Sequence, residues 1–214
     1  MKFIPLLVSV VLMASCQQNT TKTSNNEQVT ITEPNQPSFQ QGDIIFQGND
    51  IGQSKAVKLA THSEYSHVGV VLEENDKFVV FEAVEPVKIT PLDEWISHGD
   101  NDEYVVMRLK NKSQVTFNEQ KVDSLKSAWL GKNYDLPFEW SDDELYCSEL
   151  VWKFYKEGCG IKLCETKQMK DFDLTHPYTR AILADRYGSE IPYEQEVVSP
   201  QDIYESELLE QIDL

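Results

Sequence analysis

Basic residues are scarce in this sequence. Lys and Arg number 19 against 36 Asp and Glu, so the formal net charge is −17 at pH 7. Nucleic-acid binding depends on clustered Lys and Arg that neutralise phosphates and release counterions, and no such basic stretch exists here. We therefore exclude nucleic acid as a partner. The acidic charge itself leaves two readings open, attraction of cationic substrates and solubility.

Metal-binding patterns, repeats and long apolar runs are absent as well. The four cysteines and four histidines include no close-spaced Cys and His pair of the kind that binds zinc, so we expect neither a metal nor a cofactor. No internal repeat suggests a solenoid, and 214 residues with 40% hydrophobic content suffice for one domain with a sizeable core. The apolar run at residues 3–12 is too short for a mature transmembrane helix.

The N-terminal residues resemble a secretion signal. Lys2 precedes the apolar run, and Met13-Ala-Ser-Cys16 is similar to a bacterial lipobox, in which cleavage before the cysteine leaves a thiol that receives lipid. We expect residues 1–15 to be a lipoprotein signal peptide and Cys16 to carry a lipid anchor, facing the periplasm or exterior of a bacterial cell envelope. The alternative is an ordinary signal peptide in which Cys16 has no role. Residues 16–38 are mostly polar and predict a flexible tether.

Residues 39–214 predict a single α+β domain with strands first and helices after. Apolar and β-branched runs predict strands, which form a largely antiparallel sheet, at residues 42–47, 66–72, 77–84 and 103–109. Helical spacing predicts helices at residues 51–60, 116–129, 147–157 and 199–209. Thr116 and Glu119 suggest a capping box for the second of these helices, and Gly158 suggests the end of the third. Residues 162–198 stay unassigned.

The cysteine count singles out Cys147. If Cys16 carries lipid, three cysteines remain in an oxidising compartment. Cys159 and Cys164 are close enough in sequence to bridge, although spacing alone does not decide whether they do. Cys147 is then unpaired. An unpaired thiol in an exported protein is either buried and inert or kept free because its reactivity is used.

Cys147 begins a helix whose apolar positions lie on the same face, at Leu150, Val151, Phe154 and Tyr155. A helix N-terminus carries partial positive charge and unpaired amides, which favour thiolate and can bind a developing oxyanion. Three acidic residues at 142–144 act in the opposite sense, so an imidazole partner must do more of the activation. The alternative is a core cysteine that packs as a small hydrophobe.

His67 is the candidate base, and Glu82 is the candidate residue that orients it. His67 opens one apolar strand, and Glu82 lies inside the next, where a buried carboxylate needs a partner. A four-residue loop at residues 73–76 would place the two side chains opposite each other, a register that a different loop would change. A structural histidine is the alternative for His67. The other histidines, His62, His98 and His176, are expected at the surface.

These segments together resemble the YiiX/YaeF family of permuted papain-like cysteine amidases, within the NlpC superfamily. The resemblance rests on Gly42-Asp-Ile-Ile-Phe, Ser66-His-Val-Gly-Val-Val, Phe81-Glu-Ala and Tyr146-Cys-Ser-Glu-Leu-Val. It implies a circularly permuted papain-like fold, because the histidine precedes the cysteine. It also implies Cys147 as nucleophile, His67 as base and Glu82 as third member. Tyr134 and Tyr146 are candidate pocket residues or oxyanion donors, and packed tyrosines are the equal alternative.

Three functions remain open from sequence. The first is a cysteine amidase or peptidase that cleaves amide bonds of small peptides, plausibly cell-wall peptides, through an acyl-enzyme. The second keeps this chemistry but acts on lipid or other acyl groups as a hydrolase or acyltransferase. The third is a non-catalytic binding lipoprotein, against which the presence of all three triad residue types argues. The sequence carries no signal for the oligomeric state.

Overall fold

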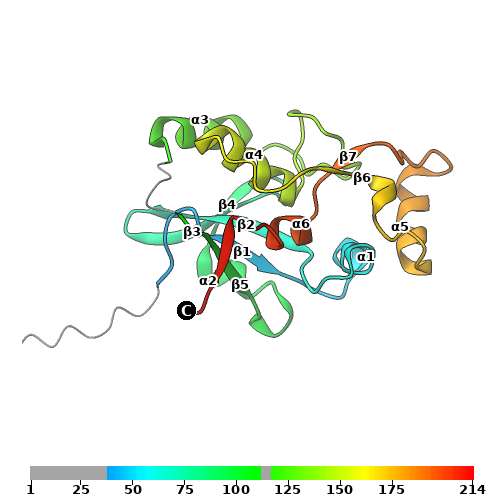
Figure 1. Ribbon diagram of the computed structural model, residues 1–214, viewed down its shortest axis with the longest axis horizontal. Coiled ribbons are helices and arrows are strands. Elements are labelled where there is room, and N and C mark those ends of the chain that lie inside the picture. Colours follow the sequence, from blue (N-terminus) through cyan, green and yellow to red (C-terminus); the bar gives the residue numbers. More distant parts are fainter. Residues whose placement is uncertain (1–37, 112–116) are drawn as a thin grey trace, which may run out of the picture. The chain divides into compact units, whose positions relative to one another are not determined.

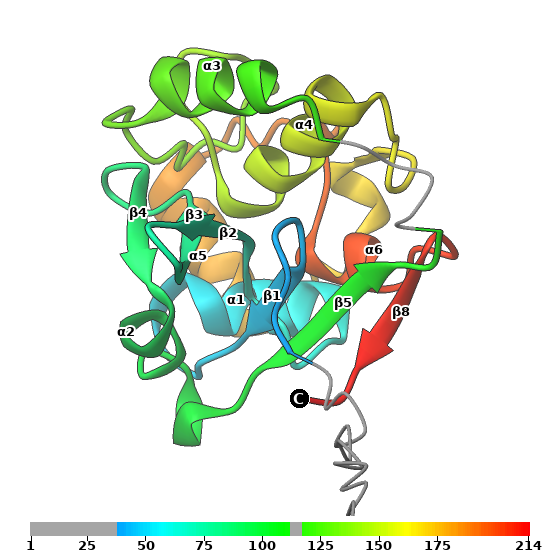
Figure 2. The ribbon, with the colours of Figure 1, turned by 90° about the vertical axis from the view of Figure 1, so that its left-hand side faces the viewer.

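An antiparallel sheet organises the fold in the computed structural model, which describes residues 38–111 and 117–214. In that part of the chain the largest sheet has six strands in the order β4-β3-β2-β1-β5-β8, and Figure 2 labels all six (Figures 1 and 2). The strands are β1 (Ile44–Gln47), β2 (His67–Glu74), β3 (Lys77–Glu82), β4 (Lys88–Pro91), β5 (Val105–Leu109) and β8 (Leu209–Ile212). All neighbouring strands are antiparallel, and the predicted α+β class is confirmed.

Both faces of this sheet are covered. In β1, Ile44 and Phe46 point into one apolar core, whereas Ile45 points into a second core on the opposite face. The first core is covered by α4 (Cys147–Cys159), with α3 (Glu119–Trp129) packed on it, as Figure 2 shows. The second core is covered by α2 (Leu92–Ile96). Burial on two faces explains why the strands are runs of apolar residues with little alternation.

The remaining elements lie beside the sheet. Helix α1 (Gly52–Thr61) packs against α5 (Pro177–Tyr187), and the two helices lie next to each other in Figure 1. The short α6 (Pro200–Tyr204) packs on α4. A two-stranded ladder joins β6 (Lys167–Gln168) to β7 (Glu196–Val197). The single-turn 3₁₀ helices are η1 (Asp100–Asp102) and η3 (Met169–Asp171). The segment that the sequence left unassigned therefore supplies β6, η3, α5 and β7.

Helix ends differ from the expected positions in three places. The side chain of Asn118 caps α3 by accepting from the Lys121 backbone N–H, and Thr116 lies outside the described residues. Helix α4 continues through Gly158 to Cys159. Gly160 caps it, and its φ of 74° is the left-handed conformation common at helix ends. Leu209 does not belong to a helix. It begins β8 because β5 provides a strand partner that local sequence does not reveal.

The hairpin of β2 and β3 is tighter than expected. Asn75 and Asp76 both have positive φ, 51° and 59°, and form a two-residue turn that pairs Glu74 with Lys77. The expected four-residue loop is therefore wrong, and the register shifts by two residues. A shift of two keeps every side chain on its original face. Since Val70 pairs with Phe81, Glu82 lies opposite Gly69 rather than opposite His67.

Two polar contacts tie the start of β1 to its neighbours. The carboxylate of Asp43 is fully buried and receives two hydrogen bonds from Arg108 of β5, at 2.7 and 2.8 Å. This bidentate pair satisfies a carboxylate that would be costly to bury alone. On the other side, the hydroxyl of Tyr155 in α4 donates to the carbonyl of Gly42. Helix α4 is thereby attached directly to the central strand.

Three predicted features lie outside the described residues: the signal peptide at residues 1–15, the lipid site at Cys16 and nearly all of the tether at residues 16–38. Across residues 38–111 and 117–214, no helix has both the length and the apolar character needed to cross a membrane. The N-terminal assignments therefore stay predictions.

Gly69 and Gly158 provide a matched test of the packing around the hairpin. A Cβ at Gly69 would lie 2.4 Å from Val80 Cγ1 and 3.2 Å from the Phe81 carbonyl, whereas a Cβ at Gly158 has its nearest neighbours at 3.8 Å. We expect Gly69→Ala to lower the free energy of unfolding by about 1–3 kcal/mol through overpacking. Gly158→Ala should raise it by roughly 0.5–1 kcal/mol, as in other helix interiors. Urea unfolding measures the free energy of unfolding of both variants. Equal changes in the two would contradict the register of β2 and β3.

Candidate active site

His67 and Glu82 meet despite the shifted register. His67 Nε2 lies 2.6 Å from Glu82 Oε2, a diagonal contact between the ends of β2 and β3. The residue opposite Glu82 is Gly69, which has no side chain to stand between the carboxylate and the imidazole. Because a carboxylate accepts, Nε2 of the ring carries the proton and donates. Nδ1 is left for another partner.

Glu82 is held by two further donors that sequence reasoning missed. Its side chain is almost fully buried, with 1% of the residue exposed. Thr90 Oγ1 donates to Oε1 at 2.5 Å, and Trp95 Nε1 donates to Oε2 at 2.8 Å. The Trp95 ring also stacks on the His67 ring, with centroids 5.7 Å apart. Strand β4 and helix α2 therefore fix both the acid and the plane of the imidazole.

Cys147 is the other partner of His67. Burial opposes protonation of the imidazole, but hydrogen bonds and charges from Cys147 and Glu82 outweigh it and raise the pKa of His67 to about 10. Burial likewise opposes the thiolate, and the interaction with His67 outweighs it, so the pKa of Cys147 is lowered. These two directions describe a thiolate and imidazolium pair, with the imidazolium held by the buried Glu82.

The start of α4 places the thiol. Cys147 is the first helical residue, and the backbone N–H of Ser148 points at its sulfur, which also lowers the thiol pKa. Glu149 accepts from the backbone N–H of Tyr146 at 3.3 Å. Lys153 contacts Glu149 at 2.9 Å and Asp142 at 2.6 Å. One of the acidic residues upstream of the thiol is thus paired with a lysine of the same helix.

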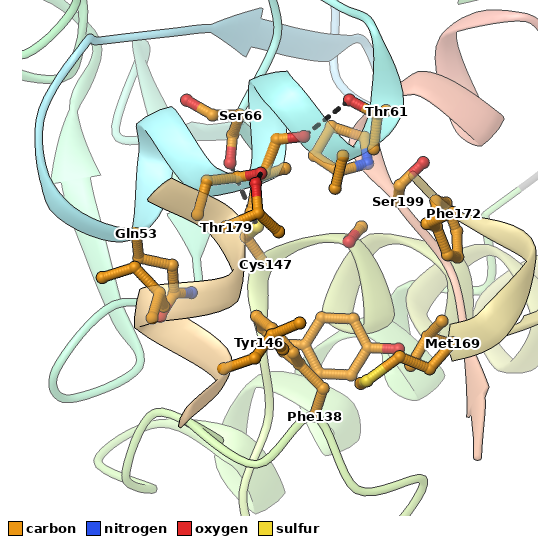
Figure 3. Close-up of a pocket in the computed structure, with 18 of the residues that line it drawn as sticks. Gln53, Thr61, Ser66, Phe138, Tyr146, Cys147, Met169, Phe172, Thr179 and Ser199 are labelled. Carbon is orange, nitrogen blue, oxygen red and sulfur yellow. Dashed lines mark hydrogen bonds between the residues drawn. The ribbon is translucent and has the colours of Figure 1, made fainter. Parts of the chain in front are cut away.

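An apolar cavity of about 100 Å³ opens beside the thiol (Figure 3). Phe138, Tyr146 and Met169 line one side of the view, whereas Thr61, Ser66 and Thr179 line the other. Most of the wall is aliphatic or aromatic, and it includes Leu174, Ile182 and Leu183 from the segment left unassigned by sequence. An engineered apolar cavity of about 150 Å³ accepts benzene, so this one suits a small apolar group.

The two candidate tyrosines have different surroundings. Tyr134 and Cys147 interact through their side chains, and the Tyr134 hydroxyl accepts a hydrogen bond from Gln53 Nε2 at 2.9 Å. Tyr146 lines the cavity, but its hydroxyl accepts from the backbone N–H of Val198 at 3.1 Å and its ring packs edge-on against Phe138. Tyr134 therefore stays a candidate donor in the cavity that the thiol lines, whereas the hydroxyl of Tyr146 is already used and its ring contributes a wall.

The other cysteines and histidines do not belong to the site formed by Cys147 and His67. Cys159 and Cys164 are both free thiols, and burial raises the pKa of Cys164 to about 12. His62 is 75% exposed and contacts Asp173, and His176 caps α5 through its ring nitrogen. Within residues 38–111 and 117–214, no three His, Cys, Asp or Glu side chains lie close enough to hold one metal ion.

Comparison with known proteins gives the family. Residues 38–213 match the family described as "Permuted papain-like amidase enzyme, YaeF/YiiX, C92 family". The chain belongs to this family. The resemblance seen in the motifs is confirmed, and so is the permuted papain-like fold, in which the histidine strand precedes the cysteine helix. The family supports a cysteine hydrolase as the kind of function.

Two Escherichia coli proteins are similar over most of their length. The uncharacterised protein YiiX of strain K12 is 48% identical over 167 residues, which make up 78% of this chain and 82% of YiiX. The crystal structure of YiiX from strain O157:H7, described as a metalloprotein, matches with a TM-score of 0.75 at 47% identity, covering 81% of this chain and 96% of that chain. The described residues of the present chain lack a ligand cluster for such a metal centre, and no metal enters the steps proposed below.

Alkylation of Cys147 tests the pairing with His67. The thiolate and imidazolium pair exists between the pKa values of its two members. The pKa of Cys147 is lowered, and that of His67 is about 10. Labelling by iodoacetamide should therefore already be fast well below about pH 8. His67→Ala should move the rise in rate up to the ordinary thiol range.

Mass spectrometry of the Cys147 peptide measures the rate separately from the other thiols. His62→Ala is the matched control, because the His62 side chain is 75% exposed and pairs with Asp173 instead. Equal labelling of wild type and His67→Ala at low pH would contradict the pairing.

Proposed function

We propose that this protein is a cysteine amidase or peptidase that cleaves amide bonds of small peptides through an acyl-enzyme on Cys147. The observation that supports it best is the alignment of Cys147, His67 and Glu82, in which a buried carboxylate holds one ring nitrogen and leaves the other for the thiol. This is the arrangement that nucleophilic thiol catalysis requires. Cell-wall peptides are the substrate class that we propose, given the expected location in the envelope.

The reaction proceeds in two halves. The Cys147 thiolate attacks the amide carbon, and the carbonyl electron pair moves onto oxygen. We assign the backbone N–H of Cys147, at the start of α4, and the hydroxyl of Tyr134 as the donors to that oxygen. His67 then gives its proton to the leaving amine as the C–N bond breaks. In the second half His67 takes a proton from water, which attacks the thioester and releases the acid and the thiolate.

An acyl substrate other than a peptide is the second candidate. The wall of the cavity beside Cys147 is mostly apolar, which favours an aliphatic or aromatic group next to the scissile carbonyl. The same thiol chemistry would cleave an ester or transfer the acyl group. Incubation with peptidoglycan fragments and with acyl lipids, followed by mass spectrometry of the products, chooses between the two candidates.

Two substitutions test the catalytic roles. Cys147→Ala should abolish product formation and the transient mass increase of the acyl-enzyme. Glu82→Gln keeps the size of the side chain but removes the charge that stabilises the imidazolium, so kcat should fall by about 100-fold or more. Glu73→Gln, at an exposed position on β2, is the control and should retain activity. Full turnover by Cys147→Ala would rule out the thiol mechanism.

We also propose that the protein is anchored by lipid on Cys16 to a bacterial membrane and reaches its substrate through the polar residues that follow. The support is the sequence Met13-Ala-Ser-Cys16 after an apolar run.

Fractionation of cells tests the anchor. Wild type should sediment with membranes and incorporate labelled palmitate, whereas Cys16→Ser should do neither. Cys164→Ser, which removes a thiol from the folded domain, is the control and should behave as wild type. Labelling of Cys16→Ser would contradict the anchor.

A further inference from the structure

A line of polar side chains leads from α5 to the thiol. Arg186 Nη2 lies 2.5 Å from Gln53 Oε1, and Gln53 Nε2 lies 2.9 Å from the hydroxyl of Tyr134. Tyr134 lines the same cavity as Cys147, and the two side chains influence each other's pKa. Arg186 and Gln53 come from α5 and α1, which pack against each other, and both residues line the cavity beside Cys147.

The chemistry of each group fixes the direction of every hydrogen bond in this line. A guanidinium can only donate, so the atom of Gln53 that faces Arg186 must be the amide oxygen. The amide nitrogen therefore faces Tyr134 and donates to its oxygen. A phenol oxygen that accepts from Gln53 still has one proton to donate, and that proton must point elsewhere. Cys147 lines the same cavity as Tyr134, and we assign its sulfur as the acceptor of this proton.

We propose that Gln53, held by Arg186, is a positioning residue that aims the hydroxyl proton of Tyr134 at the Cys147 thiolate and at the oxyanion that forms there. This inference rests on the proposed function, because it assigns Tyr134 as the side-chain oxyanion donor of that reaction. Gln53 and Arg186 act through Tyr134.

The surroundings of Tyr134 keep it a donor. Burial and the charge of Cys147 raise the pKa of Tyr134 well above its ordinary value, so the phenol stays protonated across the working pH range. Its hydrogen bond contributes to the lowered pKa of Cys147. The guanidinium of Arg186 also lies over the Phe138 ring, 4.8 Å from its centroid, which restrains the group that orients Gln53. Gln53 comes from α1 and Arg186 from α5, so these two restraints reach the thiol from helices other than α4.

The pH midpoint of Cys147 alkylation tests the line without any substrate. Tyr134→Phe should raise the midpoint by about one pH unit, since a hydrogen bond to the thiolate is lost. Gln53→Met, which has a similar length and no amide, should raise it by part of that shift. In the Tyr134→Phe background Gln53→Met should cause no further shift, because it acts through the missing hydroxyl. Arg186→Met should raise the midpoint as Gln53→Met does, whereas Arg186→Lys, which still donates, should keep it close to the wild-type value.

A kinetic comparison separates positioning from general structure. Tyr134→Phe should lower kcat by about 100-fold, as loss of one oxyanion donor does elsewhere, with little change in KM. Gln53→Met should lower kcat in the same direction, and thermal melting confirms that the variant is folded. If Gln53→Met does not fold, Gln53→Glu takes its place. The carboxylate would accept the hydroxyl proton of Tyr134 and draw it away from the thiolate. Gln53→Glu should therefore raise the alkylation midpoint more in the wild-type chain than in the Tyr134→Phe variant.

The outcomes distinguish this inference from the proposed function. A wild-type midpoint in the ordinary thiol range would overturn the proposed function and the inference with it. Two results would overturn the inference alone, provided that the wild-type midpoint is lowered. Either Gln53→Met leaves that midpoint unchanged, or it shifts the midpoint equally in the wild-type and Tyr134→Phe backgrounds.

Discussion

The burial of the Glu82 carboxylate is the constraint on which the site depends. An ionised carboxylate removed from water loses several kcal/mol of solvation, so it is stable only where donors replace the water. Three donors do so, from His67, Thr90 and Trp95. They come from β2, β4 and α2, so strand pairing and helix packing must both be correct before the acid is satisfied. The imidazole is consequently oriented by the same contacts that stabilise this end of the sheet.

The position of α4 is the second constraint. The helix buries its apolar face on the sheet, and the hydroxyl of Tyr155 attaches it to the start of β1. Its first residue, Cys147, therefore reaches the end of β2 where His67 lies. A thiol at a helix N-terminus gains a donor from the Ser148 backbone, while the imidazole provides the larger stabilisation of the thiolate. The activation of the thiol thus depends on the contact between sheet and helix more than on the helix alone.

The cavity is built by a different part of the chain. Its walls come from α1, from the loop that carries Tyr134 and Phe138, and from the segment between β6 and α6. The elements that hold Glu82 and His67 are therefore largely separate from those that line the cavity. Sequence changes in the second group can alter which acyl group fits without disturbing the triad geometry, because few of these residues contact Glu82 or His67.

Local patterns in the sequence were sufficient for four strands of the sheet, for helix α4 and for the residue types of the triad. Strand runs, helix periodicity and the unpaired Cys147 identified β1, β2, β3, β5 and α4, and with them the thiol and imidazole. The hairpin loop was expected to have four residues and has two, yet Glu82 still reaches His67. The physical reason is that a register error of two residues preserves the face of each side chain.

Tertiary structure alone decided the contacts between distant segments. No local signal marks Thr90, Trp95, Gln53 or Arg186, because each contacts a partner on another element that becomes its neighbour only when the chain folds. Leu209 was assigned to a helix because its strand partner, Leu109, is a hundred residues earlier in the chain. Sequence periodicity reports which face of an element is buried. It does not report which element buries it, and the orientation of the imidazole and of Tyr134 depends on that choice.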